Sequence, residues 1–261
     1  MKYPKRDQGS HKGQNGKILI IGGNEFFHGA PILTARGAEA SGSDLIFLGI
    51  PKKHAVVARI ASENFIVHEF KKDYFSELDV NHFIEFGNSM CTAFVIGNGL
   101  GTKKDTHKSL IKFLENIKIP GIIDADGLIP EVLKIKRKNE WIFTPHSIEF
   151  ERIFGMKDSK NNIKEMSKRH DITILKKGVV DIIASKNKYF ENITGCAEMT
   201  VGGSGDALAG VCGALLSQGQ TPFDSAKIAA YFWGKAGEKV LKNQKFFSSK
   251  NICKIFPKTI K

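Results

Sequence analysis

The amino-acid sequence predicts an α/β fold, with a mostly parallel central sheet and helices on both of its faces. First, apolar runs of strand length recur along the chain with helical segments between them, an alternation typical of parallel sheets. Second, these runs are largely apolar, as expected of strands that helices cover on both sides. Third, glycine and polar residues gather where the predicted strands end, which is where such sheets bind ligands.

The first predicted strand, KILIIGG (17–23), is a continuous apolar run that ends in glycines, and it leads into a predicted helix over 30–41. Further apolar runs predict strands at 44–50, 92–99, 119–126, 141–145 and 172–178, with a helix over 104–116.

The last third of the predicted fold begins with a hairpin, because residues 179–185 and 188–193 flank Lys186–Asn187. Two helices, near 206–218 and 221–242, are predicted to finish the fold. The first of them is apolar all round, so we expect it in the core. Neither a repeat nor a low-complexity linker interrupts the chain, and we therefore expect a single domain over 1–261.

The composition is that of a globular protein long enough to build one sizeable core, with 41% hydrophobic and 25% charged residues among 261. No run of about 18 apolar residues predicts a membrane-spanning helix. The polar start of the chain lacks the apolar segment of a signal peptide. Four scattered cysteines without a C-x-x-C pair argue against a zinc site and indicate reduced thiols, so we expect a cytoplasmic protein without a membrane partner.

The net charge of +12 comes from lysines spread along the chain, without a compact motif of basic and aromatic residues. We therefore expect no nucleic-acid partner. A generally basic surface favours small anionic ligands such as nucleotides.

Glycine and polar residues follow five of the predicted strands, and turn chemistry alone does not account for so many. These positions are Gly22–Asn24, Gly97–Gly101, Asp124–Asp126, Thr144–His146 and Lys177–Gly178. Because the carboxyl ends of parallel strands share one edge of the sheet, they predict a ligand site there.

Three common motifs are excluded by single residues. A phosphate-binding P-loop needs Ser or Thr after Gly-Lys, but Ile18 follows Lys17. The dinucleotide fingerprint needs glycine where Thr102 stands, and the nucleophile elbow needs glycine where Asp206 stands. His146 and Glu149 could share a helical face as part of a metal site, or they could simply begin a polar helix after Pro145.

The stretch TVGGSGDALAGVCGA (200–214) predicts an anion hole at the mouth of a buried helix. Gly203, Ser204 and Gly205 can donate backbone N–H groups to a phosphoryl group, and Asp206 can act as the base that activates an attacking alcohol. An acidic residue near a helix start is also a common turn feature.

Two further sites stay open between a functional and a structural interpretation. Asp124 and Asp126 could hold Mg²⁺ through waters, or could cap the helix that follows. Lys177 could contact a nucleotide phosphate, or begin the hairpin. The residues alone therefore predict phosphoryl transfer to a small molecule.

Motifs along nearly the whole chain resemble the NAD(P)H-hydrate dehydratases. The matching segments are HKG (11–13), IIGGNEFFHGAP (20–31), VIGNGLG (95–101), IIDADGL (122–128), FTPHSIEFERIFG (143–155), LKKGVVDIIAS (175–185) and MTVGGSGDALAGVCGALLSQG (199–219). The resemblance implies a ribokinase-like fold, a three-layer α/β/α sandwich. The Gly-Gly-Ser-Gly-Asp segment alone indicates only the wider kinase superfamily; the Gly-Ala-Pro, Asp-Ala-Asp and Thr-Pro-His segments make the resemblance specific.

The resemblance implies a repair reaction in which ADP drives the dehydration of the S form of NAD(P)H hydrate, releasing AMP and phosphate. Asp206 would take the proton from the C6 hydroxyl. The hydrate-binding positions of the family fall on Ala30, Gly99, His146 and Asp206. Its nucleotide-binding positions fall on Lys177, Gly178, Val179, Val180, Asp181 and Gly205.

The chain departs from the family pattern at several positions. Asn98 stands where proline is usual, Phe27 where tyrosine is frequent, and Asn24 where serine is found. Asp181 replaces Thr or Ser and puts a negative charge near the nucleotide, which leaves ADP or ATP open as the co-substrate.

The resemblance also implies a homo-oligomer that works with a separate epimerase, since too few residues precede the first strand for an epimerase domain. Whether NADH or NADPH hydrate is preferred stays open. The competing hypotheses are an ATP-dependent kinase of a small sugar or vitamin precursor on the same fold, and a nucleotide-binding protein without turnover.

Overall fold

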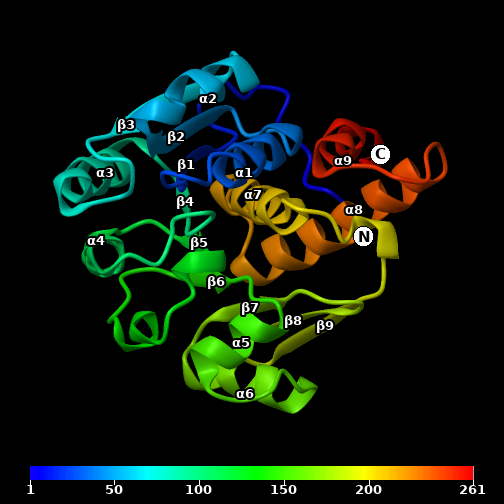
Figure 1. Ribbon diagram of the computed structural model, residues 1–261. Helices are drawn as coiled ribbons and strands as arrows, with labels where there is room; N and C mark the ends of the chain where they lie inside the picture. Colours follow the sequence, from blue (N-terminus) through cyan, green and yellow to red (C-terminus); the bar gives the residue numbers. More distant parts are fainter. Residues whose placement is uncertain (261) are drawn as a thin grey trace.

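The computed structural model describes residues 1–260, and its centre is a nine-stranded sheet (Figure 1). The strands are β1 (Lys17–Ile21), β2 (Leu45–Pro51), β3 (Phe65–Phe70), β4 (Ala93–Ile96), β5 (Gly121–Ile123), β6 (Trp141–Phe143), β7 (Thr173–Lys176), β8 (Asp181–Ser185) and β9 (Lys188–Asn192). Their order is β3-β2-β1-β4-β5-β6-β7-β8-β9. All pairs from β3 to β7 are parallel, and β8 and β9 add an antiparallel hairpin, so the predicted sheet is confirmed.

Helices cover both faces of this sheet, which gives three layers (Figure 1). They are α1 (Gly29–Ala40), α2 (Ala55–Ala61), α3 (Glu77–Met90), α4 (Lys104–Asn116), α5 (Ser147–Phe154), α6 (Lys160–Arg169), α7 (Ser204–Ser217), α8 (Pro222–Leu241) and α9 (Ser249–Ile255). Alternate residues of β1 point to opposite faces of the sheet. Ile18 and Ile20 belong to the core that also contains side chains of α1, α7 and α8, whereas Leu19 and Ile21 belong to the core that contains side chains of α3 and α4.

Two expectations about the ends of the fold need correction. The strand β3, at the edge of the sheet, was not predicted from its sequence FIVHEF. The two predicted C-terminal helices do not finish the fold, because α9 follows α8 and packs against it and against α1.

Helices α1 and α7 touch backbone to backbone, because glycines face the partner helix at their crossing. A Cβ atom at Gly37 would lie 2.0 Å from the carbonyl oxygen of Ala207, and one at Gly210 would lie 1.9 Å from that of Thr34. Real Cβ atoms do not approach other atoms so closely, so only glycine permits this contact. The helix that carries Asp206 is thereby fixed directly against the helix that carries Ala30.

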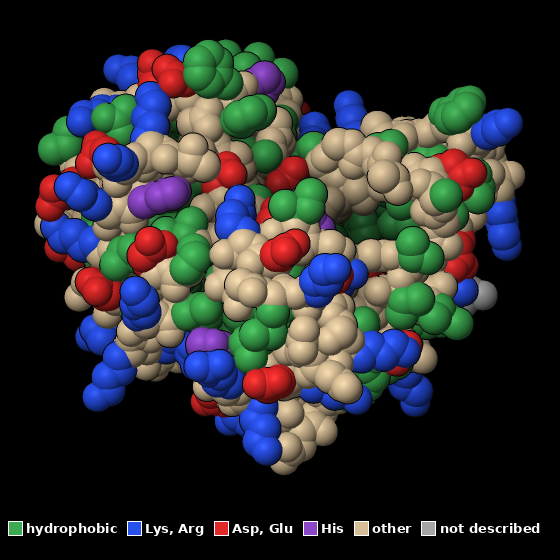
Figure 2. Space-filling model, turned by 60° about the horizontal axis from the view of Figure 1, so that its bottom comes forward, with side chains coloured by type: hydrophobic (Ala, Val, Ile, Leu, Met, Phe, Trp, Pro, Cys, Tyr) green, Lys and Arg blue, Asp and Glu red, His purple; other side chains and the backbone are tan. Residues whose placement is uncertain are grey.

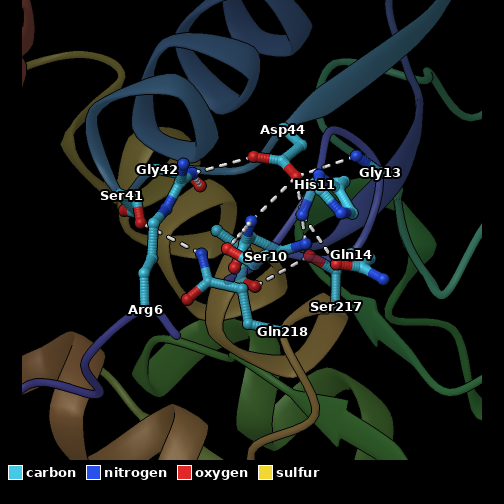
Figure 3. A network of polar contacts seen from close by, with 12 residues as sticks. Arg6, Ser10, His11, Gly13, Gln14, Ser41, Gly42, Asp44, Ser217 and Gln218 are labelled. Carbon is cyan, nitrogen blue, oxygen red and sulfur yellow. Dashed lines mark hydrogen bonds and ion pairs between the residues drawn. The ribbon is translucent and has the colours of Figure 1, made fainter. Parts of the chain in front are cut away.

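The segment before β1 is tied to the body of the protein by the carboxylate of Asp44, as Figure 3 shows. One oxygen accepts the backbone N–H groups of Gly13 and Asn15 at 2.9 and 3.0 Å, and the other pairs with Arg6 at 3.0 Å. Burial would raise the pKa of Asp44, but these donors outweigh it and hold the pKa below its usual value. The charged carboxylate therefore organises the start of the chain.

Within residues 1–260, no helix is both long and apolar enough to cross a membrane. Lysines and arginines are scattered among acidic side chains over the face in Figure 2 and do not gather into one patch. All four cysteines are free thiols.

Candidate active site

The start of α7 lies where the sequence predicts the anion hole. Gly203 precedes the helix with φ of 82°, a left-handed conformation that favours glycine, and Asp206 lies in the first turn. The Ser204 N–H donates to the carbonyl of Val201 at 3.2 Å, so it is already in use. The N–H groups of Gly203 and Gly205 therefore remain as the proposed phosphate donors.

Four side chains from three strand ends and one helix form a continuous polar chain beside the start of α7. Lys177 donates to Asp124 at 2.8 Å, and the amide nitrogen of Asn98 donates both to Asp124 at 2.9 Å and to Asp206 at 2.7 Å. Asn98 and Asp124 are completely buried or nearly so. We call Lys177, Asp124, Asn98 and Asp206 the polar chain.

Neighbouring charges tune the two ends of the polar chain. Burial, together with the charge of Asp124, raises the pKa of Asp206 to about 6, even though Asn98 and Lys177 act in the opposite direction. Burial alone would lower the pKa of Lys177, but Asp124 and Glu149 outweigh it and raise the pKa above its usual value. Lys177 thus stays charged at neutral pH, whereas Asp206 gains or loses its proton near pH 6, which is in the pH range where enzymes use general bases.

A pocket of about 810 Å³ opens next to the polar chain. Its walls include Lys177, Gly178, Val179, Asp181 and Gly205, which are five of the six predicted nucleotide-binding positions. Val180 does not line it within the described residues. A Cβ atom at Gly205 would lie 3.2 Å from the ammonium nitrogen of Lys177, so helix start and lysine are in close contact.

The positions predicted to bind the hydrate divide into two groups. Ala30 and Gly99 lie side by side, since a Cβ atom at Gly99 would be 3.1 Å from that of Ala30, and neither lines the pocket. His146 does line the pocket. Asp206 belongs to the polar chain that borders it.

His146 and Glu149 begin a helix, which was the structural interpretation of that pair. The ring Nδ1 of His146 accepts the N–H of Glu149 at 3.2 Å, and the Glu149 carboxylate accepts the N–H of His146 at 2.8 Å. This is a capping box with histidine in the place of serine. Because Nδ1 accepts, the neutral ring carries its proton on Nε2.

Asp124 and Asp126 each have a partner within the protein. Asp124 makes no capping hydrogen bond to the turn that follows it and instead pairs with Lys177 and Asn98. Asp126 accepts the N–H of Gly101 at 2.9 Å. Among residues 1–260, no three His, Cys, Asp or Glu side chains gather to hold a metal ion. The two carboxylates therefore do not belong to a metal site of three protein ligands, and their contact with Mg²⁺ through waters stays a prediction.

Asp181 has a structural task that its identity did not predict. Its carboxylate accepts the N–H of Gly178 at 3.0 Å and the amide of Asn192 at 3.1 Å. It therefore holds the turn between β7 and β8, and its hydrogen-bonded oxygens face the protein. Burial raises the pKa of Asp181.

Sequence reasoning missed several residues of this region. Thr194, Met199 and Trp233 also line the pocket, and the indole N–H of Trp233 donates to the Ser204 hydroxyl at 3.3 Å. Thr194 was marked only by its position after the hairpin and Trp233 only by its place inside the last predicted helix, whereas Met199 opens the matching segment 199–219 without having been assigned a role. Asn98 was noted as a departure, but its contacts with two carboxylates were not expected.

In comparisons with known proteins, the chain matches proteins that are named NAD(P)H-hydrate dehydratases. A family model described as NAD(P)H-hydrate dehydratase matches residues 18–258. The chain is 32% identical over 266 residues to the ADP-dependent (S)-NAD(P)H-hydrate dehydratase of Cenarchaeum symbiosum (strain A), which covers 99% of this chain and 93% of that protein.

Two solved structures share the fold. A ribokinase-like superfamily protein from Enterococcus faecalis V583 superposes with a TM-score of 0.86 and 22% identity, covering 97% of this chain and 89% of that one. The ADP/ATP-dependent NAD(P)H-hydrate dehydratase from Bacillus subtilis, co-crystallised with ATP and Mg²⁺, superposes with a TM-score of 0.85 and 23% identity. The superposition covers 99% of this chain and 93% of that one. The predicted ribokinase-like α/β/α sandwich is confirmed.

Proposed function

This chain belongs to the NAD(P)H-hydrate dehydratase family, and from that premise we propose that it is an ADP-dependent (S)-NAD(P)H-hydrate dehydratase, a hydro-lyase. The observation that carries the proposal is the position of Asp206, a carboxylate with a pKa of about 6, beside a glycine-lined helix start and a charged lysine. This combination of base, N–H donors and cation is what phosphoryl transfer requires.

In the proposed reaction, Asp206 removes the proton of the C6 hydroxyl as that oxygen attacks the terminal phosphate of ADP. An O–P bond forms and the bond between this phosphorus and the AMP oxygen breaks. The C6–O bond of the phosphate ester then breaks, a proton leaves the neighbouring ring carbon, and the ring double bond is restored. Phosphate is a far better leaving group than hydroxide, which is why the nucleotide is needed.

The other residues bind and orient the reactants in this proposal. Lys177 and the N–H groups of Gly203 and Gly205 hold the phosphate that is transferred. The turn from Gly178 to Asp181 contacts the rest of the nucleotide. Ala30, Gly99 and His146 hold the nicotinamide part of the hydrate. Magnesium would accompany the nucleotide phosphates and neutralise part of their charge.

The proposal is tested by mixing the protein with NADH hydrate, Mg²⁺ and either ADP or ATP, while following the absorbance of the reduced nicotinamide. With ADP, we expect the absorbance to return and one AMP and one phosphate to be released for each NADH that is formed. We also expect only the S epimer to disappear rapidly on chiral chromatography, the R form following after a separate epimerase is added. A stable phosphorylated product without phosphate release would instead identify a small-molecule kinase.

The pKa of Asp206 predicts an acid limb in the pH profile. A base must be deprotonated, so kcat/KM is expected to be constant above a pH of about 6 and to fall as the pH drops through that value. The measurement is kcat/KM for the hydrate at saturating nucleotide across this range. A limb at the ordinary carboxylate value would mean that the base is a less buried residue.

We further propose that the protein assembles as a homo-oligomer and works in the cytoplasm with an epimerase that is a separate protein. Four unpaired thiols fit a reducing compartment.

A further inference from the structure

Asn98 occupies an unusual position between two carboxylates. It follows β4 between two glycines, it is completely buried, and its amide nitrogen donates one hydrogen to Asp124 and the other to Asp206. Both hydrogens of the amide are therefore used to join two groups of like charge.

The other end of the same amide has no partner. The Oδ1 atom of Asn98 is buried and accepts no hydrogen bond within the described residues. A buried acceptor without a donor costs free energy, so the orientation of the amide needs a reason. Turning the amide over would point its oxygen at two carboxylates, which is worse. The carboxylates thus determine the orientation of Asn98, at the expense of its own oxygen.

The charges around Asp206 explain what such a link achieves. Asp206 faces Asp124 at the end of β5, Glu149 on α5 and Lys177 at the end of β7. Lys177 is held by Asp124 at 2.8 Å and by Glu149 at 3.9 Å. Without a link, Asp206 would be pushed away by two carboxylates and drawn toward the one lysine, and neither movement keeps it directed at a substrate.

We propose that Asn98 is a positioning residue, which fixes the carboxylate of Asp206 by one oxygen and so leaves the other oxygen directed at the substrate hydroxyl. This rests on the proposed function, in which Asp206 is the base. In-line transfer tolerates little displacement, so a base held at 2.7 Å by a rigid amide has a direct kinetic advantage. The same link keeps Asp124 and its lysine at a constant separation from the base.

The test replaces Asn98 by alanine and, in case that variant does not fold, by serine, whose single hydroxyl hydrogen cannot reach both carboxylates at once. Thr106→Val is the matched control, because Thr106 is also buried, with an oxygen that has no hydrogen-bond partner among residues 1–260, but lies on α4. We expect kcat to fall by about 10- to 100-fold in both Asn98 variants, with the nucleotide KM nearly unchanged. The acid limb of kcat/KM should move upward by about one pH unit.

A second readout needs no substrate. The carboxyl carbon of Asp206, followed by carbon-13 NMR against pH, should titrate about one unit higher in Asn98→Ala than in the wild type. An unchanged titration and an unchanged pH profile in a folded variant would overturn the positioning role. If the wild type did not turn over the hydrate, the proposed function would fail, and the NMR titration would still decide whether Asn98 holds Asp206.

Discussion

Asp206→Asn is expected to lower kcat by about 10²- to 10⁴-fold while leaving nucleotide affinity close to that of the wild type. The substitution keeps the shape of the side chain and removes the base. The helix start and Lys177, which we propose hold the phosphate, stay in place. Kcat from the nicotinamide absorbance and nucleotide Kd from calorimetry measure the two effects separately.

The same variant has an expected effect on stability with a definite sign. Since the folded-state pKa of Asp206 is about 6, above the usual value of 3.8 for an aspartate, protonation favours the folded state. Charged Asp206 therefore costs stability at pH above 6, and Asp206→Asn should melt at a higher temperature than the wild type there. The advantage should shrink as the pH falls below 6. Asp105→Asn, an isosteric change on α4 at a half-exposed carboxylate that pairs with Lys72, is the control and should alter neither rate nor this pH dependence. Wild-type turnover in Asp206→Asn would remove Asp206 from the mechanism, and lost nucleotide binding would assign it to phosphate binding.

Lys177→Met is expected to reduce the free energy of unfolding by about 3–5 kcal/mol, because it leaves the Asp124 carboxylate buried without its cation. Asp124 has a side-chain exposure of only 1%, so water cannot replace the lost partner. Nucleotide affinity should fall as well if Lys177 binds phosphate. Denaturant unfolding and nucleotide titration measure the two losses.

A double variant separates these two consequences. Lys177→Met combined with Asp124→Asn removes both charges of the closest pair, and it should recover most of the lost stability because Asp124, the carboxylate nearest to Lys177, no longer carries a charge without a partner. It should not recover nucleotide affinity. Recovery of both would mean that Lys177 acts only as the partner of Asp124, and recovery of neither would mean that the pair is not what holds these strand ends.

Much of the framework around the site follows from local patterns. The apolar runs predicted six of the seven parallel strands, and α4 begins and ends at the predicted residues. The turn at Lys186–Asn187 joins β8 and β9 as expected. The missed strand, FIVHEF, lies at the edge of the sheet, where part of the strand is exposed to solvent. Its histidine and glutamate interrupt the apolar run. No apolar-run rule finds such a strand.

The contacts of the site could not be predicted in the same way. Glycine and acidic residues after strands indicated which residues were candidates, because strand ends share one edge. Which side chains meet depends on the strand order β4-β5-β6-β7 and on the position of α7 relative to these strands. The local periodicity of the sequence predicts neither of them. Asp124 was therefore interpreted as a metal ligand or a cap, when its partners, Lys177 and Asn98, come from strands distant in sequence.

The backbone contact between α1 and α7 restricts how proteins of this sequence can diverge. Helices separated by side chains can drift apart or rotate as those side chains are exchanged, and an active site can be retuned by such repacking. At Gly37 and Gly210 there is no side chain to exchange, and any addition collides with a carbonyl oxygen. The spacing between the start of α1 and Asp206 is thus closed to gradual variation. A change of substrate preference therefore has to arise in the loops after the strands, while the backbone contact between α1 and α7 stays the same.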